Sequence, residues 1–196
     1  MPKILNLEKN TTILYGPPGS GKTTLAMLSA LDYIKEGKKV LFFDTEQTFS
    51  VDRFIQLSKD KKLLDNLLLT RVNNFKEQQM QINTLYKLKN SVSLIIIDTI
   101  GNHYRMLVKS KPDLANRMLG SQYRALKDLS ASIPVLILNQ VYENPVTNEI
   151  IMVGGNISLE NADQLIELKK EPRQIVFKKE NKSRFFRITE EGIHLV

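Results

Sequence analysis

Cysteine is absent from this chain of 196 residues, and histidine occurs only twice, as His103 and His194. Without cysteine, neither a disulfide framework nor a thiolate metal site can form. Structural zinc sites usually take four nitrogen or sulfur ligands, and two imidazoles do not supply them. The composition therefore argues against a zinc enzyme.

Long apolar segments are missing as well. The N-terminal sequence MPKILNLEKN contains no extended apolar stretch, and a run such as Leu94 to Ile97 has the length of a strand. A membrane-spanning helix needs about 20 apolar residues, and a secretory leader needs an apolar core of its own. We therefore expect a soluble, cytoplasmic protein.

Acidic residues are outnumbered by basic ones, 21 to 28, which gives a formal net charge of +7 and a pI near 9.5. This excess favours polyanionic partners such as nucleic acid, although a lysine-rich solvated surface explains it equally well. Many of the basic residues cluster near the C-terminus: Lys169, Lys170, Arg173, Lys178, Lys179, Lys182, Arg184 and Arg187.

Unbroken apolar runs bounded by turn residues recur along the chain, which is typical of strands buried on both faces of a sheet. These runs cover residues 12–15, 40–43, 67–72, 93–97 and 134–138. Helical patterns lie between them, at 23–35, 51–58, 76–89 and 112–130. The alternation predicts an α/β fold with a central, mostly parallel sheet. Shorter segments at 164–169, 174–177 and 184–188 are expected to extend that sheet, partly as antiparallel strands.

The segment GPPGSGKTT, residues 16–24, matches the phosphate-loop pattern G-x-x-x-x-G-K-[ST] between a predicted strand and a predicted helix. In such a loop, backbone N–H groups surround the phosphates, Lys22 reaches the β and γ oxygens, and Thr23 binds magnesium. The alternative is a glycine-rich turn without a nucleotide. We expect ATP and Mg²⁺ to be held by Gly16, Pro17, Pro18, Gly19, Ser20, Gly21, Lys22, Thr23 and Thr24.

Two acidic residues follow predicted strands. Asp98 ends the strand SLIIID, where a carboxylate on the magnesium side of a phosphate site is expected; a simple turn aspartate is the alternative. Glu46 lies just past the strand VLFFD, where it is a candidate for the group that orients the attacking water. A carboxylate that caps the next helix is the competing interpretation.

Two amides, Asn139 and Gln140, end the apolar strand PVLIL. At this position a side chain is able to contact the γ-phosphate and report its loss. Amides at strand ends often only close a turn, so both interpretations stay open.

The order of the segments GPPGSGKTT, DTEQTFSVDRF, LIIIDTIGNHYR, LILNQV and VGGNI resembles the RecA superfamily. The similarity is greatest to archaeal and eukaryotic strand-exchange recombinases and their paralogues, above all the RadB type, with KaiC-like ATPases second. It covers roughly residues 12–192, because RITEEGI is similar to the closing strand and turn of the family. The resemblance implies one RecA-like ATPase core domain over residues 1–196, without a separate N-terminal helical DNA-binding domain.

The resemblance also implies roles for individual residues. It makes Lys22 and Glu46 catalytic, with Glu46 as the catalytic acid, Asp98 the acid on the magnesium side and Gln140 the γ-phosphate sensor. Arg53, in DTEQTFSVDRF, matches an arginine that stacks on adenine, a suitable use of a planar guanidinium.

Two segments correspond to the DNA-facing loops of the family. The first, GNHYRMLVKSKPD, brings basic residues for phosphates and an aromatic ring for base stacking: Tyr104, Arg105, Lys109 and Lys111. The second, residues 142–153, is short, has no basic residue and carries Glu143 and Glu149. The segment IVFKKENKSRFF resembles a region whose lysines complete the site of an adjacent subunit, which makes Lys179 and Lys182 candidates for that role, with a basic hairpin exposed to solvent or DNA as the alternative.

We therefore expect a slow ATPase of the RadB type that binds DNA, preferably single-stranded, or assists a separate recombinase in repair, or does both. Whether it forms a homo-oligomer stays open. One alternative is a KaiC-like regulatory ATPase that acts through nucleotide-dependent assembly. Another is a small-molecule kinase, because GPPGSGK also resembles the start of adenylate kinases. The kinase is disfavoured, because polar residues at successive strand ends describe hydrolysis with a γ-phosphate sensor.

Overall fold

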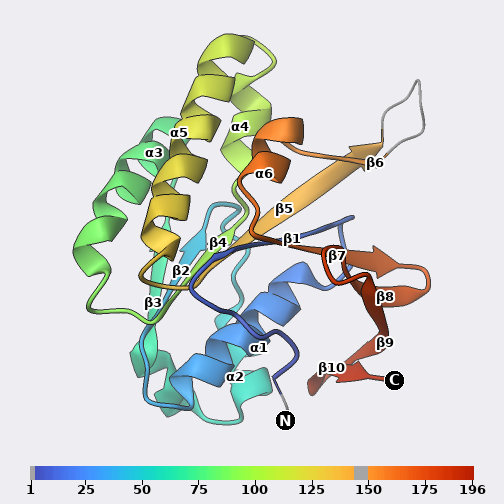
Figure 1. Ribbon diagram of the computed structural model, residues 1–196. Coiled ribbons are helices and arrows are strands. Elements are labelled where there is room, and N and C mark those ends of the chain that lie inside the picture. Colours follow the sequence, from blue (N-terminus) through green and yellow to red (C-terminus); the bar gives the residue numbers. More distant parts are fainter. Residues whose placement is uncertain (1–2, 144–149) are drawn as a thin grey trace.

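The computed structural model describes residues 3–143 and 150–196, which form an α/β fold around one ten-stranded sheet (Figure 1). The strand order is β10-β9-β8-β7-β1-β5-β4-β2-β3, with β6 paired to β5. The strands are β1 (Thr11–Gly16), β2 (Val40–Asp44), β3 (Leu67–Arg71), β4 (Leu94–Asp98), β5 (Val135–Glu143), β6 (Ile150–Met152), β7 (Gln164–Lys170), β8 (Arg173–Phe177), β9 (Lys182–Thr189) and β10 (Gly192–Leu195).

Helices cover both faces of the central strands. The α-helices are α1 (Lys22–Ile34), α2 (Val51–Ser58), α3 (Phe75–Thr84), α4 (Asn102–Leu107), α5 (Pro112–Ser130) and α6 (Gly155–Glu160), and short 3₁₀ helices span Lys61–Asn66 and Leu85–Leu88. Figure 1 shows α1 and α2 on one side of the sheet and α3, α4 and α5 on the other. None of the helices in the described part of the chain is long and apolar enough to cross a membrane.

The unbroken apolar runs of the central strands follow from this three-layer arrangement. Successive side chains of β4 point to opposite faces, so Leu94 and Ile96 join the core around α1, while Ile95 and Ile97 join the core around α5. Both faces of these strands are covered by helices, and every residue of β1, β2 and β4 is buried. Strands β7, β1, β5, β4, β2 and β3 pair in parallel, which confirms the predicted fold class.

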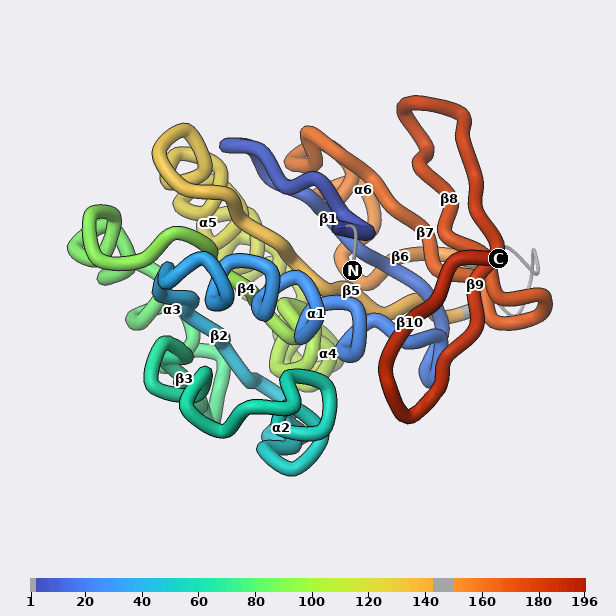
Figure 2. The backbone as a smooth tube through the Cα atoms, turned by 90° about the horizontal axis from the view of Figure 1, so that it is seen from below, coloured from blue at the N-terminus to red at the C-terminus, as the bar shows by residue number. Residues whose placement is uncertain are grey.

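The C-terminal strands extend the sheet in antiparallel fashion, again as predicted. Ile175, Phe186 and Ile193 are buried on the face that carries α1. Figures 1 and 2 show β9 and β10 folded back beside that helix. The last part of the chain is thereby brought beside the loop that follows β1, where Ile188 lies against Gly21.

The main difference from the sequence prediction is the segment after β4, which was expected to be a loop. It forms the short helix α4, with His103 and Tyr104 buried against the neighbouring elements. A single turn and a half of helix offers too little periodicity to be recognised. The helix predicted at 76–89 also differs, because it passes into 3₁₀ geometry at Leu85.

Candidate active site

The polar residues predicted from separate segments meet at the carboxyl edge of the parallel strands. Gly16, at the end of β1, pairs with Gln140 of β5, and Asp44 of β2 pairs with Asp98 of β4. This register places the phosphate loop beside the strand ends that carry the other polar groups. Parallel α/β sheets form their ligand sites at this edge.

The phosphate loop between β1 and α1 uses its glycines for two different reasons. Gly21 has φ = +100°, a left-handed conformation that side chains rarely adopt, and a Cβ there would lie 2.7 Å from Ile188 Cδ1. At Gly16 a Cβ would lie 2.3 Å from the carbonyl oxygen of Leu168 in β7. The loop is therefore packed tightly between β7 and β9.

Lys22 begins α1 and is almost fully buried. Its Nζ donates hydrogen bonds to the carbonyl oxygens of Gly16 (2.8 Å) and Pro17 (2.9 Å). Burial lowers the pKa of the Lys22 ammonium, while the charges of Asp98 and Glu46 oppose that shift. A buried cation that faces two carboxylates suits a phosphate ligand, which adds negative charge to the same site.

Thr23 and Asp98 form the acidic side of the loop. The Thr23 hydroxyl donates to Asp98 Oδ2 over 2.8 Å. Burial raises the pKa of the Asp98 carboxyl to about 7; Thr23 opposes the rise, and the carboxylates of Glu46 and Asp44 add to it. A hydroxyl and a carboxylate are oxygen ligands of the kind that Mg²⁺ prefers beside nucleotide phosphates, so these residues fit the predicted ion.

Glu46 receives two hydrogen bonds on the same oxygen. Thr99 Oγ1 donates to Glu46 Oε1 over 3.0 Å, and Gln140 Nε2 donates to it over 2.5 Å. Glu46 follows β2, Thr99 follows β4, and Gln140 lies within β5. The side chain is thus fixed in the site, not turned back to cap α2, whose cap is Ser50.

Thr45 and Asn102 hold this edge together, and sequence reasoning missed both, as it missed Thr99. Thr45 Oγ1 donates to the carbonyl oxygen of Thr99 (2.6 Å) and accepts from the Thr99 N–H (3.0 Å). Asn102 Nδ2 donates to the Thr45 carbonyl over 2.7 Å. A hydroxyl directly after each strand-end carboxylate, as in DTE and IDT, is the signal that was available.

These groups enclose a polar cavity of about 340 Å³. Its lining residues are Pro18, Gly19, Gly21, Lys22, Thr23, Thr24, Glu46, Asp98, Thr99, Gln140 and Ile188. The structure therefore brings the phosphate loop together with Glu46, Asp98 and Gln140 in one cavity. Asn139 is buried elsewhere and donates to the carbonyl oxygen of Val153 over 2.9 Å.

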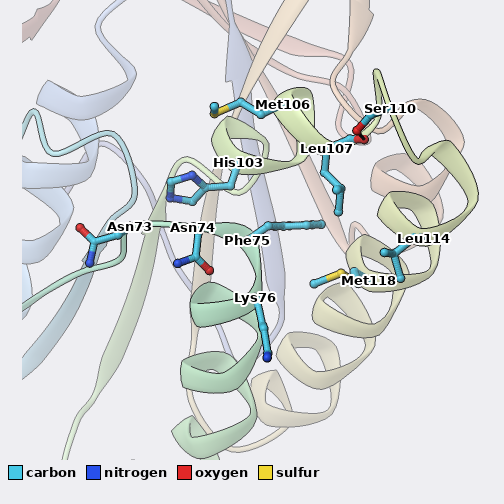
Figure 3. Close-up of a pocket in the computed structure, with 10 residues that line it drawn as sticks. All are labelled: Asn73, Asn74, Phe75, Lys76, His103, Met106, Leu107, Ser110, Leu114 and Met118. Atoms are coloured by element: carbon cyan, nitrogen blue, oxygen red, sulfur yellow. Dashed lines mark hydrogen bonds between the residues drawn. The ribbon is translucent and has the colours of Figure 1, made fainter.

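A larger hollow, of about 490 Å³, lies between α3, α4 and α5, the helices on the other side of the sheet from α1 and α2 (Figure 3). Phe75 extends from the start of α3 toward Leu114 and Met118 of α5, and His103 lies beside it. The His103 ring is bonded to the carbonyl oxygen of Val72 over 3.2 Å. This hollow is apolar and lacks convergent charged groups, so we assign the chemistry to the smaller polar cavity.

Arg53 lies in α2 at the margin of the site. Its guanidinium donates to the carbonyl oxygens of Glu190 (2.7 Å) and Thr189 (2.9 Å), and to Gln56 Oε1 (2.5 Å). Its plane is thereby tied to the turn between β9 and β10. The predicted stacking on adenine stays a prediction.

The first predicted DNA-facing segment presents its basic residues as expected: Arg105, Lys109 and Lys111 are exposed. Tyr104 is different, because only 9% of it is exposed, its hydroxyl donates to Asn116 Oδ1 (2.8 Å), and its ring packs edge-on against Phe75. The expectation that Tyr104 stacks on a base is therefore not supported by its position. Tyr142, near the end of β5, is 53% exposed and lines a hollow of about 470 Å³ together with Arg105, Lys109 and the mostly buried ring of Tyr104.

The remaining predicted residues lie away from the polar cavity. Lys179 donates to the carbonyl oxygen of Ala162 (3.1 Å), and Lys182 pairs with Glu180 (3.2 Å), both near the turn between β8 and β9. Residues 144–149 of the second predicted DNA-facing segment, including Glu149, lie outside the described residues.

Comparison with known proteins agrees with this arrangement. The Rad51 family model matches residues 8–192. The chain belongs to the Rad51 family. The DNA repair and recombination protein RadB of Methanococcus maripaludis strain C7 is 35% identical, over 97% of this chain and 94% of its own length. RadB of Thermococcus kodakarensis is 32% identical over 93% of this chain and 88% of its own length.

A solved structure shows that the likeness extends to three dimensions. The crystal structure of the RadB recombinase superposes with a TM-score of 0.79 at 30% identity, covering 97% of this chain and 92% of that one. The resemblance to RadB-type members of the RecA superfamily is thereby confirmed, and it favours a recombinase paralogue over a KaiC-like regulator. Rad51-family proteins are ATPases that bind nucleotide, usually with Mg²⁺.

Proposed function

We propose that this chain is a RadB-type DNA repair and recombination protein that binds ATP with Mg²⁺, hydrolyses it slowly and contacts DNA. The observation that carries the proposal is the single polar cavity in which Lys22 and Thr23 of the phosphate loop face Glu46, Asp98 and Gln140. A kinase of the adenylate type would need an acceptor pocket beside the loop, whereas here that space is lined by the Glu46 carboxylate and the Gln140 amide bonded to it.

The site divides the work of hydrolysis among its own residues. The N–H groups of the loop and Lys22 bind the phosphates and stabilise the charge that develops on them. Glu46 Oε1 is occupied by Thr99 and Gln140, which leaves Oε2 to orient a water in line with the γ-phosphate and draw its proton. Thr23 would hold a Mg²⁺ ion with Asp98 behind it, and the ion would neutralise negative charge on the phosphates.

Gln140 links the nucleotide to the DNA side of the molecule. It is bonded to Glu46, and two residues further along β5 lies the exposed Tyr142. A γ-phosphate that competes for the Gln140 amide alters the position of this strand end. We therefore assign Gln140 the role of γ-phosphate sensor and the surface formed by Arg105, Lys109, Lys111 and Tyr142 the role of DNA contact.

The direct test is ATP hydrolysis by the wild type and Glu46→Gln, with and without single-stranded DNA, across a series of salt concentrations. We expect slow turnover that DNA modulates and that Glu46→Gln lowers by about 10² to 10³. No DNA binding even at low salt would remove the recombination part of the proposal, because phosphate contacts are strongest there. The protein that the chain assists is then sought by binding assays with a purified recombinase.

A further inference from the structure

The hairpin formed by β7 and β8 lies against the outside of the phosphate loop. Arg173, the first residue of β8, donates from Nη1 to the carbonyl oxygen of Gly19 over 3.1 Å and to that of Ser20 over 3.4 Å. A few residues earlier, the Leu168 carbonyl of β7 lies against Gly16, where it leaves no room for a side chain. The hairpin thus contacts both the start and the centre of the loop.

The hydrogen bonds of Arg173 determine which way the loop peptides face. In a trans peptide the C=O and the following N–H point in opposite directions, so a carbonyl held on the outer side turns the next N–H inward. The Ser20 N–H donates to the Pro17 carbonyl (3.2 Å). The bond from Arg173 to the Ser20 carbonyl leaves the N–H of Gly21, a residue that lines the cavity, on the opposite side of that peptide. Inward N–H groups are what a phosphate loop offers its ligand.

Lys22 and Arg173 hold different carbonyls of the same loop. Lys22 bonds to those of Gly16 and Pro17 and must give them up when its ammonium reaches the phosphates. Arg173 bonds to those of Gly19 and Ser20 from outside the cavity, so its contacts remain compatible with a bound nucleotide. A guanidinium suits this task because its donors lie in a fixed plane.

The arginine is well anchored for this task. Arg173 pairs with Lys170 in the ladder between β7 and β8, and β7 pairs with β1, the strand that leads into the loop. Its position relative to the loop is therefore set by the sheet. The side chain is also partly buried, which strengthens hydrogen bonds from a charged donor.

We propose that Arg173 is a positioning residue of the nucleotide site: it keeps the phosphate loop in the conformation that receives the β- and γ-phosphates. This inference rests on the proposed function, since it concerns the affinity of the same site for MgATP. Loss of the guanidinium weakens nucleotide binding, whereas Glu46 and its water-orienting geometry stay in place. The effect therefore falls on KM and Kd, not on kcat.

The test measures MgATP binding by calorimetry and steady-state hydrolysis for the wild type, Arg173→Gln and Arg173→Lys. Arg184→Gln is the matched control, since Arg184 is an exposed arginine on the next strand. We expect Arg173→Gln to raise Kd and KM about tenfold, the effect of losing a charge-assisted hydrogen bond, while kcat at saturation stays within about threefold. Arg173→Lys recovers part of the affinity, and Arg184→Gln binds like the wild type.

The outcomes separate this inference from the proposed function. A wild type that binds no nucleotide defeats the proposed function itself. A wild type that binds, together with an Arg173→Gln protein whose Kd is within about twofold of it, overturns only the role of Arg173. An equal loss of affinity in Arg184→Gln, or a loss confined to kcat, overturns it too. If Arg173→Gln unfolds, the Kd of Arg173→Lys decides, and a value equal to that of the wild type counts against the inference.

Discussion

Glu46 shows how much chemistry depends on a single held side chain. Thr99 and Gln140 occupy one of its oxygens, and the other remains for water. Glu46→Gln keeps the shape and the two partners but removes the base. We expect kcat to fall by about 10² to 10³ with MgATP affinity nearly unchanged, measured by steady-state hydrolysis and calorimetry. Full activity in the variant would show that another group orients the water.

Asp98 makes stability depend on pH when no nucleotide is bound. Burial raises its pKa to about 7, so between roughly pH 4 and pH 7 the folded state binds a proton that the unfolded state has released. Stability from this group is therefore present at low pH and is lost as pH approaches 7. Relative to the wild type, Asp98→Asn, which cannot ionise, is expected to gain roughly 1–3 kcal/mol of stability between pH 5 and pH 8.

Thermal unfolding of both proteins in EDTA, without nucleotide, measures this difference. A gap in Tm between Asp98→Asn and wild type that grows from pH 5 to pH 8 supports the assignment. A gap that is constant with pH contradicts it. The same variant should lose MgATP affinity, because Asp98 stands behind Thr23 on the magnesium side of the loop.

At the scale of elements, local patterns predicted what depends on local sequence. The buried parallel strands and the phosphate loop each carry their signal within ten residues, and α2 and α5 have the predicted bounds. The contacts of Glu46 carry no such local signal, since Thr99 is 53 residues away along the chain and Gln140 is 94 residues away. These contacts depend on β4 lying between β2 and β5, and no single segment of the sequence predicts the order of the strands. The same holds for Arg173, which reaches Gly19 across 154 residues.

Helix α4 and strand β5 explain why two tyrosines of the DNA-facing region should behave differently. Tyr104 belongs to the core and is bonded to Asn116, whereas Tyr142 is more than half exposed beside Arg105 and Lys109. Tyr142→Ala is expected to weaken binding of single-stranded DNA by about 1–3 kcal/mol without changing Tm, because a stacked base loses its platform. Tyr104→Phe should lower Tm slightly and leave DNA affinity unchanged.

Fluorescence anisotropy with a labelled oligonucleotide, together with thermal melts, distinguishes the two cases. Equal DNA affinity in wild type and Tyr142→Ala would show that this ring does not stack on bases. Reduced DNA affinity in Tyr104→Phe, at unchanged Tm, would show that Tyr104 contacts DNA after all.

Across the whole molecule, the proposed nucleotide site and the proposed DNA-contacting surface share two strands. β4 ends in Asp98 and leads through Thr99 into α4, which carries Arg105; β5 presents Gln140 to the cavity and Tyr142 to the surface. In the proposed mechanism, a displacement of Gln140 or Thr99 by the γ-phosphate therefore reaches the basic surface through a few residues of chain. Effects of DNA on hydrolysis and of nucleotide on DNA binding are then two measures of one coupling.

The net charge of +7 allows DNA to bind either through overall charge or through a localised basic surface. The two cases predict different salt dependences of DNA binding after mutation. If Arg105, Lys109 and Lys111 contact phosphates, replacing all three by glutamine should reduce the slope of log K against log salt by about 2, since each contact with a single strand contributes about 0.7. Lys61, Lys62 and Lys87 are exposed and lie in the 3₁₀ helices that precede β3 and β4, at the amino ends of the parallel strands. Replacing these three by glutamine changes the net charge by the same amount. A salt series of DNA binding for both variants measures the slopes. Equal slopes in the two triple variants would mean that DNA binds through overall charge, and that the surface beside α4 is not its site.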